Sequence, residues 1–146
     1  MSVAVALDGA RSQLRELPDE LLFVEPPPGM ATLTRFDLTA LDESGFLFAL
    51  RSLELAGVRL FVIPPQAYFA GYAPEVSATV RTALGLDETT QPVMLAVVHP
   101  GGDEPTTANL LAPIVVNPLT GAAAQVVLDG DEWPLRAPLG MGSDEA

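Results

Sequence analysis

The residues that could do chemistry are few in this 146-residue chain. Its one histidine, His99, ends an apolar stretch and stands before a proline, and the chain contains neither cysteine nor lysine. Nucleophilic catalysis needs a base beside the nucleophile, and no serine lies in a Gly-x-Ser-x-Gly elbow. A lone histidine in such a place is more often structural than catalytic. The residue types therefore favour a protein that is not an enzyme.

Acidic residues supply the remaining candidates. An EF-hand loop starting at Asp129 needs a bidentate glutamate at its twelfth position, where this chain has Gly140, so no metal site is predicted. Adjacent acid pairs that could in principle serve glycoside hydrolysis are Asp42-Glu43, Asp87-Glu88 and Asp103-Glu104. Neighbours on a strand point to opposite faces, and these pairs lie in turn-like segments. A small hydrolase-type enzyme with an acid pair in a cleft stays open as the alternative, and no cofactor is expected.

Charge is the most informative bulk property. Nineteen acids against seven arginines leave a net charge of −12. Such a field repels nucleic-acid phosphates and anionic membranes, so neither is expected as a partner. It favours a basic partner, although the same charge also keeps a protein dispersed. No apolar run approaches the ~20 residues that span a bilayer, and the first eight residues lack the pattern of a signal peptide. We therefore expect a soluble, cytoplasmic protein.

Prolines and glycines, 14 and 12 in number, divide the chain into short segments, which favours strands over helices. The segment 11–17 is ambiguous between helix and strand. Strands are predicted at 2–7, 21–24, 35–39, 46–50, 58–63, 93–99, 109–116 and 125–128. The residues of 117–121 are those of a tight reversal, so the last two strands should pair as a hairpin.

One helix is predicted, over residues 74–84. Pro74 suits the first helical position, and Gly85 suits a left-handed cap after the last turn. Between them, apolar residues recur on one helical face at Val76, Val80, Ala83 and Leu84. The helix is expected to lie on the sheet.

Together these elements predict a mainly β, compact antiparallel β-barrel-like single domain with one short helix. The domain is expected to span residues 1–139. Residues 140–146 read as a flexible polar tail.

The last third of the chain contains a distinctive pattern. Residues 107–120 read TANLLAPIVVNPLT, residues 125–128 read QVVL, and residues 132–139 read EWPLRAPL. In this order and with these gaps, the segments resemble the C-terminal block of the FliW family of bacterial flagellar assembly factors. That block shows N-L-x-A-P-(I/V)-V-x-N, then Q-V-(I/V)-L, then (E/D)-(Y/W)-P-(I/L)-R-x-P-L. Further motifs of the family resemble residues 21–30, 50–53, 62–65 and 68–75, so the resemblance covers roughly residues 14 to 139.

The resemblance implies a β-barrel-like fold and two protein partners. Proteins similar to FliW bind CsrA, a dimeric RNA-binding translational repressor, and antagonise it allosterically, away from its RNA face. They also bind flagellin in the cytoplasm, which couples flagellin translation to flagellin secretion. A negative protein suits a partner with a basic surface, as an RNA-binding protein has. A narrower alternative is a flagellin chaperone without CsrA antagonism.

Six residues are candidates for partner contacts, and each also has a structural interpretation. Phe69 and Tyr72 precede the predicted helix, where aromatic residues are often exposed on a loop, and Glu75 lies in its first turn. The alternative for this group is a hydrophobic staple onto the sheet. The other three match the C-terminal family block and are Asn109, Asn117 and Arg136. Structurally, Asn117 would start a turn, and Arg136 would pair with Asp129 or Asp131.

Overall fold

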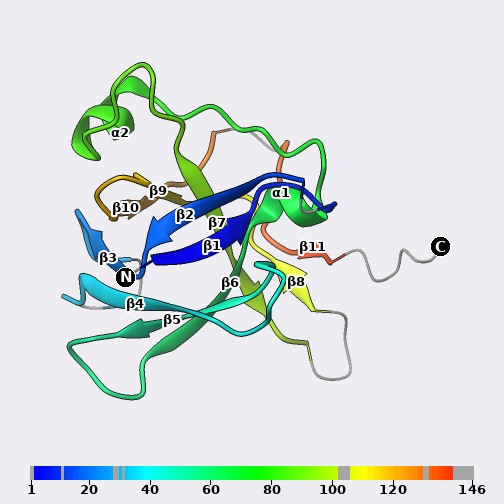
Figure 1. The fold of residues 1–146 in the computed structure, drawn as a ribbon, viewed down its shortest axis with the longest axis horizontal. Coiled ribbons are helices and arrows are strands. Elements are labelled where there is room, and N and C mark those ends of the chain that lie inside the picture. The colour runs from blue at the N-terminus through cyan, green and yellow to red at the C-terminus, as the bar shows by residue number, and fades with distance from the viewer. Residues whose placement is uncertain are drawn as a thin grey trace.

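The computed structural model describes residues 2–10, 12–27, 30, 32–101, 106–129 and 132–139 (Figure 1). The predicted tail at 140–146 lies outside the described residues. The elements, in chain order, are β1 (Ser2–Ala6), β2 (Leu14–Pro18), β3 (Glu20–Phe23), β4 (Arg35–Ala40), β5 (Phe48–Ser52), β6 (Arg59–Ile63), α1 (Pro65–Tyr68), α2 (Ala78–Ala83), β7 (Val93–His99), β8 (Thr107–Ala108), β9 (Ile114–Val116), β10 (Ala122–Gln125) and β11 (Ala137–Pro138).

Seven strands form a closed circuit, in the order β7, β6, β5, β4, β3, β10, β9 and back to β7. Six of the seven neighbouring pairs are antiparallel; β3 and β10 pair in parallel, with Leu22 opposite Ala122. The short strands β8 and β11 extend the sheet beyond β7. The prediction of a mainly β, barrel-like fold is confirmed, and the parallel pair is the feature that closes it.

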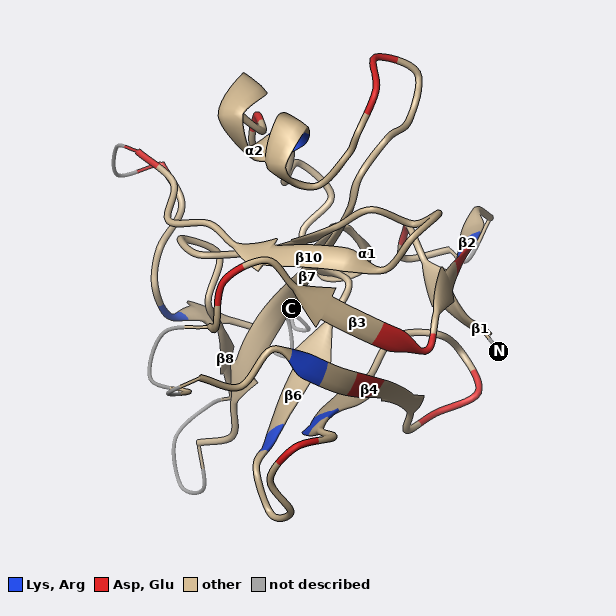
Figure 2. Ribbon diagram, turned by 90° about the vertical axis from the view of Figure 1, so that its left-hand side faces the viewer, with Lys and Arg blue, Asp and Glu red and all other residues tan. Residues whose placement is uncertain are grey.

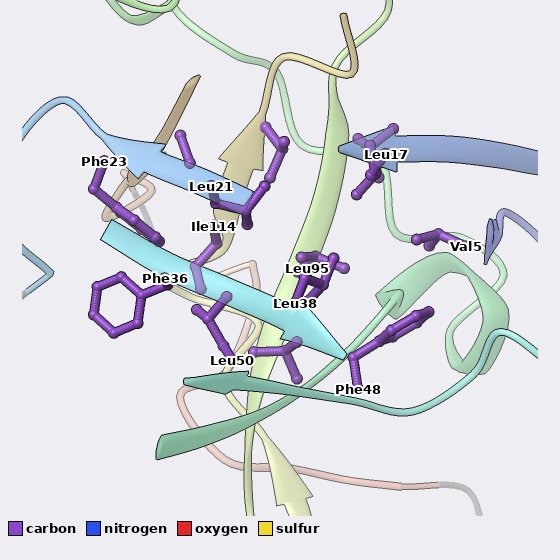
Figure 3. Close-up of a cluster of buried hydrophobic side chains, with 14 of the residues drawn as sticks. Val5, Leu17, Leu21, Phe23, Phe36, Leu38, Phe48, Leu50, Leu95 and Ile114 are labelled. Atoms are coloured by element: carbon purple, nitrogen blue, oxygen red, sulfur yellow. The ribbon is translucent and has the colours of Figure 1, made fainter. Parts of the chain in front are cut away.

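Alternating side chains fill the barrel, because successive residues of a strand point to opposite faces. On β4, Phe36 and Leu38 are buried inside, whereas Asp37 points outward, as the period-two pattern predicts. Phe36 meets the ring of Phe23 edge-on, with 5.3 Å between the centroids. Figure 3 shows the inward-pointing side chains, which come from strands around the whole circuit. The inner cluster is wholly apolar: Val5, Leu17, Leu21, Phe23, Phe36, Leu38, Phe48, Leu50, Val62, Val93, Leu95, Val97, Ile114, Val116 and Ala123.

The ambiguous segment 11–17 is a strand from Leu14 onward, whereas residues 12 and 13 belong to neither a helix nor a strand. β2 pairs with β1 in a separate two-stranded sheet, with Val3 opposite Leu17. Val5 and Leu17 are fully buried in the inner cluster. The amide of Ala6 donates to the carbonyl oxygen of Gly45 at 3.0 Å. This hairpin is therefore part of the same core as the barrel.

β7 is buried on both faces, which explains its uninterrupted apolar sequence. Val93, Leu95 and Val97 point into the barrel, while Met94, Ala96 and Val98 point outward into a second cluster. The connection between α1 and α2 and the segment around Trp133 supply other side chains to this outer cluster. The strand predicted at 93–99 coincides with β7.

Two predicted strand boundaries near the C-terminus are wrong. Residues 109–116 are not one strand, because Asn109 forms a turn and Pro113 has no amide hydrogen to donate; only Ile114–Val116 is extended as β9. Its partner β10 begins at Ala122, three residues before the predicted start. The hairpin itself is confirmed, with Ala124 opposite Val115.

The helix prediction is wrong in its beginning. α2 starts at Ala78, after Ser77, whose hydroxyl accepts a hydrogen bond from the amide of Val80 at 3.2 Å. The Ser77 cap, and not Pro74, therefore determines where the helix begins. The end is as predicted: Gly85 has a φ of 72°, and the amide of Leu86 donates to Arg81 at 2.8 Å, a Schellman ending. No residue of α2 is buried, so it does not lie flat on the sheet, and α1 was not predicted.

Candidate functional site

The connection between α1 and α2, residues 69–77, holds three of the six predicted contact residues. Phe69 follows the last residue of α1 and is half-buried against the outer cluster. Tyr72 is 1% exposed, whereas Glu75 is exposed. The connection therefore presents one carboxylate to solvent while its two aromatic residues anchor it to the barrel.

The exposure expected for Tyr72 is wrong. Its hydroxyl donates a hydrogen bond to the carbonyl oxygen of Leu110 at 2.8 Å, and its ring meets the Trp133 ring edge-on at 4.7 Å. Burial raises the pKa of Tyr72 well above its usual range. The side chain thus ties three distant segments together, as the staple interpretation of this region expects. Its partner Trp133 lies 61 positions further on, so the sequence around Tyr72 carries no sign of the contact.

Glu75 lies at the rim of an acidic hollow that the sequence did not predict. Glu75, Asp129 and Glu132 line this hollow of about 460 Å³ together with Trp133. All three acidic residues are exposed, and Trp133 is half-buried. We call this group the acidic hollow. It brings together a residue of the α1–α2 connection and residues of the C-terminal block, which are far apart in the sequence.

Asn109 and Arg136 line a different hollow, of about 390 Å³, which also includes His99. Asn109 is only 9% exposed, and its side-chain oxygen accepts from the amides of Leu111 and Ala112 at 3.1 and 3.0 Å. Arg136 is exposed. Within the described ranges the one ion pair joins Arg35 to Glu20, so Arg136 does not pair with Asp129. Asp131, its other expected partner, lies outside those ranges.

Asn117 is 2% exposed and belongs to neither hollow. Its side-chain nitrogen donates to the carbonyl oxygen of Leu84 at 2.8 Å, and its side-chain oxygen accepts from the amide of Leu119 at 2.9 Å. The residue starts the turn between β9 and β10, as its structural interpretation expects. It also fixes the end of α2 to that turn. The six predicted residues are therefore spread over three places.

The predicted acid pairs do not face one another across a cleft where the structure describes them. The Asp42 carboxylate accepts from the amides of Gly45, Phe46 and Leu47, at 3.2 to 3.4 Å. The Asp87 carboxylate accepts from both the amides and the hydroxyls of Thr89 and Thr90, and these hydrogen bonds lower its pKa to about 2. Both acids cap turns. Asp103 and Glu104 lie outside the described residues, and the barrel interior that could have held a cleft is filled with apolar side chains.

Two further surfaces were not predicted from the sequence. An apolar groove of about 580 Å³ is lined by Leu47, Phe61, Ile63, Tyr68, Val98, Pro100, Thr106 and Leu139. A hollow of about 460 Å³ lies beside the hairpin between β5 and β6, and Arg51 and Arg59 line it. Both depend on which strands pair, which the residue pattern alone does not determine. Figure 2 shows acidic residues on β3, β4 and several loops, and basic residues on β4 and β6.

Among the described residues, no helix has the length and apolar character that crossing a membrane requires. Across the same residues, no three histidine, aspartate or glutamate side chains come close enough together to hold a metal ion.

Comparison with known proteins relates the whole barrel to one family. The family model described as FliW protein matches residues 11–139. The flagellar assembly factor FliW of Symbiobacterium thermophilum is 31% identical over 118 residues, covering 80% of this chain and 86% of the relative. That of Bacillus subtilis is 30% identical over 121 residues, covering 82% and 85%. The crystal structure of a flagellar assembly factor FliW has the same fold, with a TM-score of 0.75 at 22% identity over 95% of this chain and 96% of that one. The chain belongs to the FliW family.

Proposed function

We propose that this protein is a cytoplasmic binding protein that couples flagellin translation to flagellin secretion. It binds a CsrA-type translational repressor and antagonises it allosterically, and it binds cytoplasmic flagellin. The observation that carries the proposal is the family match, which extends over residues 11–139 and so includes every strand of the closed barrel. Its relatives are named flagellar assembly factors and not enzymes.

The acidic hollow supports a basic partner. Its carboxylates, Glu75, Asp129 and Glu132, are exposed, and none of them forms an ion pair within the described part of the chain. An RNA-binding repressor carries basic surface, so close approach to this hollow lowers the electrostatic energy of the encounter. Among the six sequence candidates, Glu75 is the one placed here.

The other candidates divide by their exposure. Arg136 is exposed and Phe69 is half-exposed, so both remain available for direct contacts. Tyr72, Asn109 and Asn117 are buried and form hydrogen bonds within the fold. We propose that these three act by holding the contact surfaces in place.

Isothermal titration calorimetry with CsrA and flagellin from the same cell tests the proposal. We expect a saturable complex with each partner at tens of micromolar protein or below. Inhibition of CsrA binding to flagellin leader RNA should be noncompetitive, since the proposed antagonism is allosteric. Absence of heat with both partners would remove the proposed function.

The role of the acidic hollow has a matched control. We expect a triple variant of the acidic hollow to associate with CsrA at least about tenfold more slowly and with a weaker salt dependence. Its substitutions are Glu75→Lys, Asp129→Lys and Glu132→Lys. Glu25→Lys, Glu43→Lys and Glu88→Lys together change the net charge equally, at exposed residues without hydrogen bonds among those described. Equal slowing by both triple variants would show that net charge, and not the hollow, governs the encounter.

The narrower candidate function is a flagellin chaperone without CsrA antagonism. The apolar groove favours it, because a chaperone needs a surface that accepts apolar side chains. A reporter under the flagellin leader separates the two functions. If reporter output is the same with and without the protein while flagellin is still bound, the chaperone function holds.

A further inference from the structure

The outer face of β6 joins the apolar groove to Arg51 and Arg59, which form no salt bridge with any described residue. Arg59, Phe61 and Ile63 lie on that face, because residues two apart on a strand point the same way. Phe61 and Ile63 line the groove, and Arg59 lines the hollow beside it. The guanidinium carbon of Arg59 lies 4.9 Å from the centroid of the Phe61 ring, a cation–π contact. Groove and arginines therefore form one continuous surface.

At the basic end of this surface, two arginines lie close enough to repel each other. Arg51 and Arg59 are directly opposite each other on β5 and β6, and like charges in that position repel. Both are exposed, and no described carboxylate pairs with either one. On its other side Arg51 is opposite Asp37, whose carboxylate accepts instead from the Thr39 hydroxyl at 2.7 Å. Two cations without a salt bridge to any described residue thus lie together in a chain whose net charge is −12.

The apolar end of this surface is a groove that can accept apolar side chains of another protein. Ile63 and Val98 form its floor, at 1% and 7% exposure, and half-buried Leu47, Phe61 and Tyr68 contribute to its walls. The hydroxyl of Tyr68 is already bonded to the carbonyl oxygen of Phe46 at 3.0 Å. Its cavity of about 580 Å³ is large enough for several apolar side chains.

We propose that the outer face of β5, β6 and β7 binds an amphipathic segment of another protein, with its apolar side chains in the groove and a carboxylate between Arg51 and Arg59. Charge complementarity selects this occupant, because two neighbouring guanidinium groups are suited to a carboxylate and the groove accepts no charge. A segment with a basic end would meet the arginines and be repelled. The inference goes beyond the proposed function, since the groove and the arginines together assign the charge and the amphipathic character of the occupant, whether or not that occupant is flagellin.

Selection from a phage-displayed library of random twelve-residue peptides tests this inference on the intact protein. Enriched peptides are synthesised with a fluorophore and titrated by fluorescence anisotropy. We expect apolar residues followed by aspartate or glutamate, and a dissociation constant at least about tenfold weaker for the Arg51→Ala, Arg59→Ala variant. The matched control is Arg15→Ala, Arg81→Ala, which removes the same charge away from this face and should bind as the unaltered protein does. Circular dichroism verifies that both variants are folded.

Each other result overturns the inference. No enrichment, enrichment without acidic residues, or equal binding by the Arg51→Ala, Arg59→Ala variant would exclude the assigned occupant. A form ending at Leu139 should bind the peptides with unchanged affinity. A tenfold increase in peptide affinity after that truncation would instead show that residues 140–146 of this chain occupy the face. Concentration-dependent self-association that disappears in the arginine variant would assign it to a second copy.

Discussion

The side-chain nitrogen of Asn117 lies 2.8 Å from the carbonyl oxygen of Leu84, which is the last residue before the helix-ending glycine. This hydrogen bond joins the end of α2 to the turn between β9 and β10. Both residues are almost fully buried, so water does not compete for the carbonyl. No residue of α2 is fully buried, although Val80 packs against the outer cluster; the buried residues next to the helix, Leu84 and Leu86, belong to the segment that follows it.

Replacing Asn117 by alanine should therefore loosen α2. We expect a loss of about 1–3 kcal/mol in the free energy of unfolding, because the Leu84 carbonyl stays buried without a donor. Urea denaturation measures the loss. Amide hydrogen exchange should quicken in Ala78–Ala83. Asn109→Ala is the matched control, since Asn109 is also buried but bonds only within its own turn and to β7. Unchanged exchange in α2 of the Asn117 variant would contradict the anchoring role.

The hydroxyl groups of Tyr72 and Tyr68 allow a buried hydrogen bond to be compared with a half-buried one. Tyr72→Phe leaves the Leu110 carbonyl without its donor in a buried site, which should cost about 1–2 kcal/mol. Tyr68→Phe removes a similar bond to Phe46 at a half-buried position, where water can replace it, and should cost less than about 1 kcal/mol. Thermal unfolding of both variants measures the difference. Equal losses would mean that burial does not set the value of these bonds.

Two glycines with the same backbone conformation separate conformational strain from steric clash. Gly57 and Gly121 have φ values of 92° and 85°. A Cβ on Gly57 meets nothing within 4 Å, whereas one on Gly121 would lie 2.6 Å from the carbonyl oxygen of Glu20. Gly57→Ala should cost about 1 kcal/mol from conformation alone. Gly121→Ala should cost about 2–4 kcal/mol, because the clash falls beside the β3–β10 pair. Chemical denaturation of the two variants decides this, and similar losses would contradict the close approach.

Asp87 should make stability depend on pH at low pH. Its folded-state pKa of about 2 is below the unfolded value of about 3.9. The stabilisation is therefore fully present above the unfolded pKa and is lost as the pH falls from about 4 to about 2. Asp87→Ala lacks this contribution, so the difference between its urea midpoint and that of the unaltered protein should shrink over that range. A difference that stays constant from pH 5 to pH 2 would contradict the assignment.

The elements that the sequence predicted well are those whose signal is local. The apolar run Val93–His99 coincides with β7, and the alternation on β4 correctly separates Phe36 and Leu38 from Asp37. The reversal at 117–121 was predicted from turn residues and is confirmed. Helix boundaries were less accurate, because the Ser77 cap competes with Pro74 and propensity does not rank the two.

The surfaces were not predictable, because each combines segments that are distant in the chain. Tyr72 is buried by Trp133, and no feature near position 72 indicates that contact. Arg51 and Arg59 become neighbours only through the register of β5 with β6. The family resemblance was specific because it used ordered motifs over most of the chain. It could not tell which motif residues face solvent, so half of its candidate residues proved to be buried.

The parallel pair that closes the barrel also orders events during synthesis. Leu22 of β3 pairs with Ala122 of β10, so the two halves of the contact leave the ribosome a hundred residues apart. Until then, the edge of β3 has no strand on that side, and loop closure over so long a segment is slow. Translation must proceed about a hundred residues past β3 before the edge is covered. The nascent chain thus exposes a strand edge to other chains throughout that interval, which is a period of risk for aggregation.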